Sequence, residues 1–189
     1  MLRWINRLRN TYGYGVQSPT DYRFLKYVIR ERGEYYAYAD LRAGTSMSRA
    51  ALKKGLLYFR IANALQPDIL CDTTPNARKY KPFFQSGCGK LNIDNSALLS
   101  LDARIGDSKR LLLRLSCRDY TLDALCRIFR MLPQSTVVLL EDVCCDETVR
   151  ERYHTLLQTD EIRVCFDLGE SAICFLTNNR YKQTYYIFF

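Results

Sequence analysis

The sequence has little of what a metal-binding or disulfide-bonded protein needs. It contains one histidine, His154, and its eight cysteines include no pair at CxxC spacing. A structural zinc site takes about four His or Cys ligands at suitable spacings, so we expect no metal site. Three cysteines lie inside apolar, strand-like runs, namely Cys71, Cys165 and Cys174. Free cysteine behaves as a small buried hydrophobe there, so we predict core thiols and no disulfides.

Long apolar runs and long charge runs are also absent. No apolar stretch approaches the roughly 20 residues of a membrane helix, and the basic start "MLRWINRLRN" lacks the apolar core of a secretory signal. We therefore expect a cytoplasmic protein without a membrane span. The net charge is +8, and the basic residues are spread along the chain without a long run. It permits contact with nucleic acid or another anionic surface without establishing it.

Glycine is missing where a nucleotide-binding α/β fold normally needs it. The apolar run Ile69–Cys71 predicts a buried strand that leads into a helix, with Thr74 as a helix cap and Pro75 in the first turn. No glycine lies between Gly55 and Gly87. Glycine permits a positive φ and a close approach of backbone N–H groups to a ligand, so this turn lacks the residues that usually hold a cofactor.

The sequence after residue 67 alternates between strand-like and helix-like segments. Six near-continuous apolar runs predict strands over 69–71, 90–94, 111–115, 136–140, 162–168 and 172–176. Such runs suit parallel strands that are covered on both faces. The last two are separated only by "GES" and should form an antiparallel hairpin. We predict a doubly wound, mostly parallel Rossmann-like α/β sheet that closes in this hairpin, with helices over 121–132 and 147–157.

The first 45 residues have a different pattern and predict a helical extension, followed by an α/β domain over residues 46–189. A first short helix precedes "TYGYGVQ". A second begins after Ser18 as its cap and ends at Gly33. Residues 34–46 are expected to be a connector, and another helix should run over 46–65.

Spacing predicts that the first half of the sheet is short. About 37 residues separate Thr73 from Leu111. A parallel crossover with its helix takes at least about 10–12 residues, so two crossovers around one strand fit and three around two strands do not. We therefore expect the fold to be shortened by about one βα unit.

Four stretches together resemble bacterial class I SAM-dependent methyltransferases of the O-methyltransferase type that carry an N-terminal helical extension. These are "YGVQSP" from Tyr14, "EYYAYADL" from Glu34, "LEDVCCDETVRERYHTLLQ" from Leu140 and "VCFDLGESAICFLTNNRYKQTYYIFF" from Val164. The resemblance spans most of the chain in order and spacing. It implies a Rossmann-like fold, S-adenosylmethionine as the cofactor and a small-molecule methyl acceptor, whose identity the sequence does not give.

The departures from the family fall where its chemistry should be. The family's first strand ends "ELGTSLG", and here the matching residues 71–77 contain neither glycine. The resemblance leaves Asp72, Thr73 and Asp94 as the candidate cofactor-binding residues. Asp94 matches the acid that bonds the ribose, although it could instead cap a helix that begins near Ser96.

The candidate catalytic residues are Glu141 and Asp142, which keep the family's acid pair after its fifth strand. Ligands of α/β sheets bind at such strand ends, but a carboxylate there also suits a helix start. The aspartate that ends the family's fourth strand is Leu115 here, and its histidine is Arg118. The adjacent thiols of Cys144 and Cys145 could be reactive, although acidic neighbours oppose a lowered pKa.

These observations favour a methyltransferase-fold protein with an eroded cofactor site, inactive or weakly binding SAM, that serves as an interaction module. Two alternatives stay open. One is an active methyltransferase with a rebuilt cofactor loop, and the other is a basic RNA- or anion-binding protein on the same scaffold. The hairpin edge and the aromatic tail are candidate surfaces for a homo-oligomer.

Overall fold

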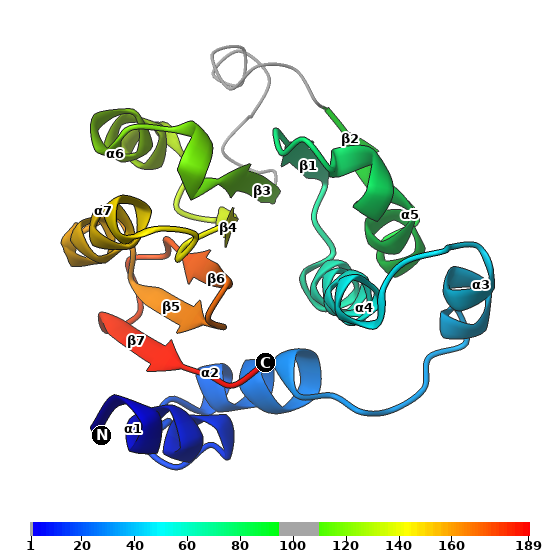
Figure 1. Ribbon diagram of the computed structural model, residues 1–189, viewed down its shortest axis with the longest axis horizontal. Helices are drawn as coiled ribbons and strands as arrows, with labels where there is room; N and C mark the ends of the chain where they lie inside the picture. The colour runs from blue at the N-terminus through cyan, green and yellow to red at the C-terminus, as the bar shows by residue number, and fades with distance from the viewer. Residues whose placement is uncertain (1, 95–109) are drawn as a thin grey trace.

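The computed structural model describes residues 2–94 and 110–189, and these residues form one mixed sheet covered by helices (Figure 1). The strand order is β2-β1-β3-β4-β6-β5-β7. The strands are β1 (Ile69–Asp72), β2 (Asn92–Ile93), β3 (Leu111–Ser116), β4 (Val137–Glu141), β5 (Val164–Asp167), β6 (Ser171–Phe175) and β7 (Gln183–Tyr186). The pairings of β1 with β2, β1 with β3, β3 with β4 and β5 with β7 are parallel. Only β6 runs antiparallel to its neighbours β4 and β5.

The predicted fold class is confirmed, because helices cover both faces of a mostly parallel sheet that contains one antiparallel hairpin. The helical segments are α1 (Leu2–Thr11), α2 (Pro19–Phe24), the π-helix η1 (Leu25–Ile29), α3 (Tyr38–Ala43), α4 (Arg49–Leu65), α5 (Ala77–Gly87), the 3₁₀ turn η3 (Cys117–Asp119), α6 (Leu122–Met131) and α7 (Glu147–Gln158). Figure 1 shows α6 and α7 on one side of the sheet and α4 and α5 on the other.

Alternation along the strands divides the core into two clusters. On β3, Leu112 packs in the cluster under α4 and α5, whereas Leu113 and Leu115 pack in the cluster under α6 and α7. Successive side chains of a strand point to opposite faces, so Arg114 shares the face of Leu112. Position 114 is therefore directed toward α4 and α5.

The N-terminal segment contributes to the core on the α4 and α5 face. Leu25, Val28 and Tyr38 are buried in the same cluster as residues of α4 and of the sheet. The buried Arg60 of α4 donates to the carbonyl of Val28 (Nε···O 2.6 Å) and to the hydroxyl of Tyr38 (3.1 Å). Figure 1 places α1 beside β7.

Sequence patterns placed most elements correctly and several helix boundaries wrongly. The helix capped by Ser18 leaves α-helical geometry at Leu25 and ends at Ile29, before Gly33. The expected connector over 34–46 contains α3. Thr74 does not cap α5, which begins at Ala77, because its side chain is bonded to Asp72 instead.

Strand β7 was not predicted. Its residues "QTYY" include only one fully buried side chain, Tyr185, so they lack the apolar run that marked the other strands. The ring of Tyr185 stacks on Phe166 with a centroid separation of 5.3 Å, and its hydroxyl donates to Asp21. Contacts that are distant in sequence therefore hold β7 against β5.

Two predictions fall on residues outside the described ranges, namely the helix near Ser96 and the shortening by one βα unit between β2 and β3. The described helices include none that is both long and apolar enough to cross a membrane. All eight cysteines are free, and the three predicted core thiols are buried.

Candidate functional site

A buried arginine lies near the carboxyl ends of the central strands, where the cofactor residues were predicted. Arg114 pairs in register with Asp72 of β1, and none of its side chain is exposed. Its guanidinium lies against the rings of Tyr58 and Tyr80, with its central carbon 4.9 and 4.8 Å from the two ring centroids. These two tyrosines project from α4 and α5, so the arginine lies between the sheet and these helices.

Each nitrogen of this guanidinium has a hydrogen-bond acceptor. Nη1 donates to Asp72 Oδ2 (2.9 Å) and to Thr74 Oγ1 (2.7 Å), and Nη2 donates to Asn76 Oδ1 (2.6 Å). Nε donates to Glu141 Oε1 (3.2 Å) at the end of β4. The side chain thus ties the turn after β1 to the ends of β3 and β4.

Glu141 completes a network in which the charges balance. Besides Arg114, it accepts a hydrogen bond from the Tyr58 hydroxyl and forms an ion pair with Lys54 of α4. Two cations therefore face two carboxylates, Asp72 and Glu141. Burial and the Glu141 charge hold the pKa of Tyr58 well above its usual value. Burial lowers the pKa of Arg114, but Tyr58, Glu141 and Asp72 outweigh it and raise that pKa above the ordinary arginine value.

Backbone amides of the turn after β1 already donate within the protein. Thr73 N donates to the carbonyl of Arg114 (3.0 Å), Thr74 N to Asp72 Oδ1 (3.1 Å) and Ala77 N to the carbonyl of Thr74 (3.1 Å). Pro75 has no N–H to offer. No residue of this turn has a positive φ. Three amides of the turn are therefore engaged within the protein, one of them with the Asp72 carboxylate.

The two candidate catalytic acids have different surroundings. Glu141 is buried in the network, whereas Asp142 is exposed and has a left-handed backbone (φ +55°). Asp142 Oδ2 accepts a hydrogen bond from Ser116 Oγ (2.6 Å). Asp142 lies just past the end of β4, and its carboxylate and that of Glu141 have different hydrogen-bond partners.

The three candidate cofactor residues occupy the neighbouring strand ends, but they are not equivalent. Asp72 is buried and bonded as described, whereas Thr73 is half-buried and accepts a hydrogen bond from Tyr120 (3.3 Å). Asp94 is half-buried beyond β2, and its amide donates to Leu70. Burial, together with the charges of Asp94 and Asp72, raises the pKa of the Cys71 thiol to about 12.

A hollow of about 980 Å³ lies on the outer side of the turn, between it and α6. Its lining includes Asp72 and Thr73 from the turn and Tyr120 and Arg127 from the α6 side. Glu141 does not line it. The hollow and the arginine network therefore share Asp72 and Thr74, which line the hollow and also bond to Arg114.

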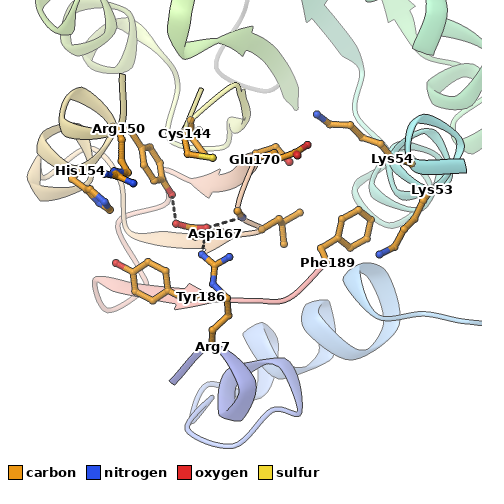
Figure 2. Close-up of a pocket in the computed structure, with 16 residues that line it drawn as sticks. Arg7, Lys53, Lys54, Cys144, Arg150, His154, Asp167, Glu170, Tyr186 and Phe189 are labelled. Atoms are coloured by element: carbon orange, nitrogen blue, oxygen red, sulfur yellow. Dashed lines mark hydrogen bonds and ion pairs between the residues drawn. The ribbon is translucent and has the colours of Figure 1, made fainter. Parts of the chain in front are cut away.

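A second cavity, of about 620 Å³, opens at the carboxyl ends of β4, β5 and β7 (Figure 2). Figure 2 shows Asp167 near its centre, with Lys53 and Lys54 of α4 on one side and Arg150 and His154 of α7 on the other. Asp167 follows the buried residues of β5, so its carboxylate reaches the cavity from the sheet itself.

The charges in this cavity are mostly paired. Asp167 binds Arg7 (Oδ1···Nη2 3.0 Å), and it accepts hydrogen bonds from Tyr153 and from the amide of Gly169. Burial raises the pKa of Asp167, although these three neighbours oppose that effect. The ammonium of Lys53 lies 4.3 Å from the centroid of the Phe189 ring, and no carboxylate of the described residues pairs with it.

The adjacent thiols of Cys144 and Cys145, considered above as reactive groups, are exposed, and Cys144 lines this cavity. Desolvation and the neighbouring Asp146 raise the pKa of Cys145. This is the opposite of the lowered pKa that a thiolate nucleophile needs. Among the described residues, no three His, Cys, Asp or Glu side chains are grouped to hold a metal ion.

Sequence reasoning missed Arg114, the residue that organises the site. One signal was present, because the run "LLLRLS" places a single charge inside an otherwise apolar central strand. A fully buried arginine is rare unless it is paired, so this pattern indicates carboxylate partners on neighbouring strands. The identity of those partners, Asp72 and Glu141, required the strand order.

The fold and site define a class, an α/β protein with a Rossmann-like sheet and a buried arginine network near the carboxyl ends of its central strands. No family model matches the chain, and no curated protein matches it. A crystal structure of a Corynebacterium glutamicum protein, a structural genomics target, is similar to it with a TM-score of 0.50 and 13% sequence identity. The alignment covers 85% of this chain and 99% of that chain. At this identity the likeness shows the fold alone.

Proposed function

We propose that this chain is a methyltransferase-like protein that does not transfer methyl groups and that serves as a binding module. The observation that carries the proposal is the fully buried Arg114 with its four acceptor residues. The space between the ends of β1 and β4 is filled by a side chain whose every nitrogen is satisfied. A ligand there would have to displace this network.

The chemistry of S-adenosylmethionine does not fit the residues at this edge. The molecule carries a sulfonium, an ammonium and a carboxylate, so it needs carboxylates for its cationic groups and free N–H donors for its own carboxylate near the first strand. Here Asp72 and Glu141 are neutralised by Arg114 and Lys54, and amides of the turn donate internally. Removing a buried charge from its partner costs about 3–5 kcal/mol, so displacement of the guanidinium would oppose binding.

Calorimetry with S-adenosylmethionine and S-adenosylhomocysteine tests this proposal. We expect no saturable binding in the micromolar range, with an active methyltransferase as the positive control. Binding in that range, weakened by Asp94→Ala and unchanged by Asp160→Ala, would instead support an active enzyme. Asp160 is the matched control because it is an exposed acid after α7, away from this edge. The hollow of about 980 Å³ beside Thr73 is where such binding would occur.

A second candidate function is the binding of a small organic anion in the cavity of Figure 2. Four cationic residues line it, namely Arg7, Lys53, Lys54 and Arg150, against two carboxylates, Asp167 and Glu170. The ammonium of Lys53 is the group in the cavity that a ligand carboxylate can pair with, since it lies only against a ring.

Thermal shift with citrate and inorganic phosphate tests this second candidate. We expect stabilisation at low salt that Lys53→Gln removes and that Lys90→Gln, at an exposed site outside the cavity, keeps. Equal shifts for both variants would show a general salt effect and would contradict a site in this cavity.

A further inference from the structure

The first 33 residues contain few acids and therefore carry much of the net positive charge of the chain. Residues 1–33 contain seven of the 28 basic residues and two of the 20 acidic residues, which gives +5 of the total +8. The rest of the chain is therefore close to balanced. This distribution makes the N-terminal segment the most basic part of the chain, and net positive charge favours contact with anions.

Exposed tyrosine rings gather in the same segment. Tyr12, Tyr22 and Tyr27 are 59, 41 and 52% exposed, although tyrosine in a folded domain normally buries most of its ring. All three line one hollow of about 370 Å³ formed by the end of α1, α2 and η1. The cationic residues Lys26, Arg30 and Arg32 line the same hollow, with Glu31 as the single acid among its described lining residues.

Cations and rings are already stacked in this hollow. The guanidinium of Arg30 lies 4.6 Å from the centroid of Tyr12, and the ammonium of Lys26 lies 5.0 Å from the centroid of Tyr27. Ring faces beside fixed cations are the surfaces on which nucleic-acid bases stack and phosphates bind.

Local backbone geometry holds the rings in place. Gly13 has φ +84°, and a Cβ at this position would lie 2.6 Å from Cε2 of Tyr22, so the ring of Tyr22 packs directly on the glycine backbone. The π-helix η1 closes with a hydrogen bond from Arg30 N to the carbonyl of Leu25 (2.9 Å). Such widened turns occur frequently at functional sites.

We infer that the hollow lined by Tyr12, Tyr22, Tyr27, Lys26 and Arg30 binds single-stranded nucleic acid. Bases stack on the tyrosine rings, and the phosphates pair with the lysine and arginine side chains. Bases in a duplex present no free face to a ring, so a single strand is the form that fits. An anionic membrane fits less well, because the apolar side chain in this hollow, Leu25, is buried and cannot insert.

Fluorescence anisotropy with labelled oligo-U and oligo-dT of about 12 nucleotides tests the inference, and the two oligomers distinguish RNA from DNA. We expect binding that weakens between about 50 and 200 mM salt, with a slope near −0.7 for each phosphate neutralised. Tyr27→Ala should weaken binding by about 5-fold to 100-fold, the range measured for one stacked base, without changing the salt slope. Lys26→Gln should reduce the slope by about 0.7.

The matched control is Tyr36→Ala, since Tyr36 is 89% exposed and lies outside the hollow. It should leave affinity unchanged, and circular dichroism should show that all the variants fold. The inference is overturned if neither oligomer binds at low salt, or if Tyr27→Ala and Tyr36→Ala bind equally well. It is also overturned if a duplex competes as well as a single strand, or if vesicles with anionic lipid bind and the oligomers do not.

Discussion

The most consequential residue of this protein is Arg114, because it turns a strand edge that could hold a ligand into packed protein. Its guanidinium joins Asp72, Thr74, Asn76 and Glu141. Buried ion pairs contribute little net stability but are costly to break. The network therefore contributes more to the geometry of these strand ends than to the free energy of folding.

Replacement of Arg114 by methionine tests this role. The variant leaves Asp72 and Glu141 buried without their partner, so we expect it to lose about 3–5 kcal/mol of unfolding free energy in urea denaturation. Adding Asp72→Asn and Glu141→Gln removes the stranded charges and should recover part of the loss. Arg130→Met is the control, because the side chain of Arg130 is 67% exposed and its pair with Glu161 is worth no more than about 1 kcal/mol. Equal stability of the Arg114 variant and wild type would contradict the network.

Asp167 gives a prediction about pH. Burial raises its folded pKa above the ordinary 3.8, so the folded protein holds this proton more tightly than the unfolded chain. The corresponding stability is fully present below the unfolded pKa and is lost as the pH rises through the folded pKa. In urea titrations over a pH series that begins near 3.8, the stability of wild type relative to Asp167→Asn should fall with rising pH. Asp160→Asn, at an exposed site, should show no such trend.

At the scale of elements, local caps set several helix starts. Ser18, Ser48 and Thr121 each accept a hydrogen bond from the amide three residues ahead. Of these, Ser18 was predicted as a cap from the sequence alone, because cap preference is a local property of a few residues. Thr74 was predicted as a cap in the same way and fails, since Asp72 and Arg114 bind its hydroxyl.

Thr121→Ala should lower the unfolding free energy by about 1 kcal/mol, because an amide at the start of α6 loses its acceptor. Thermal or urea denaturation measures the change. Thr148→Ala is a suitable control, as Thr148 is exposed in the first turn of α7 and does not cap that helix. It should change stability by no more than about 0.5 kcal/mol. Equal losses for the two threonines would show that the cap at Thr121 adds nothing.

The strands were easier to predict than α3 and β7. Central parallel strands are buried on both faces, and that burial leaves an apolar run in the sequence. By contrast, β7 pairs with β5 on one side and is held by Tyr185 against Phe166 and Asp21. Neither contact can be recognised from the four residues of the strand alone.

At the scale of the whole molecule, the N-terminal segment is part of the core. Leu25, Val28 and Tyr38 pack with α4 and the sheet, and Arg60 depends on carbonyls of the segment and on Tyr38. A domain boundary was predicted at residue 45 because the sequence pattern changes there. In the structure, side chains from both sides of this boundary pack in one hydrophobic cluster.

Removal of residues 1–45 should abolish cooperative unfolding, because it uncovers part of the hydrophobic cluster on the α4 and α5 face and leaves the buried Arg60 without these acceptors. Circular dichroism melting and gel filtration measure this outcome. Removal of residues 1–11 alone takes away α1 and keeps these contacts, so that shorter chain should still melt cooperatively. A cooperative melt of the 46–189 chain would show that the extension is dispensable for folding.

The sequence by itself determined the α/β class, the positions of the buried strands, the helix cap at Ser18 and the loss of glycine after β1, because each depends on local composition or periodicity. Only the tertiary structure decided that Asp72 and Glu141 share one arginine, that Glu141 and Asp142 have different hydrogen-bond partners, and that three tyrosines meet in one hollow. These facts depend on strand order and on helix packing, which bring together residues far apart in the chain.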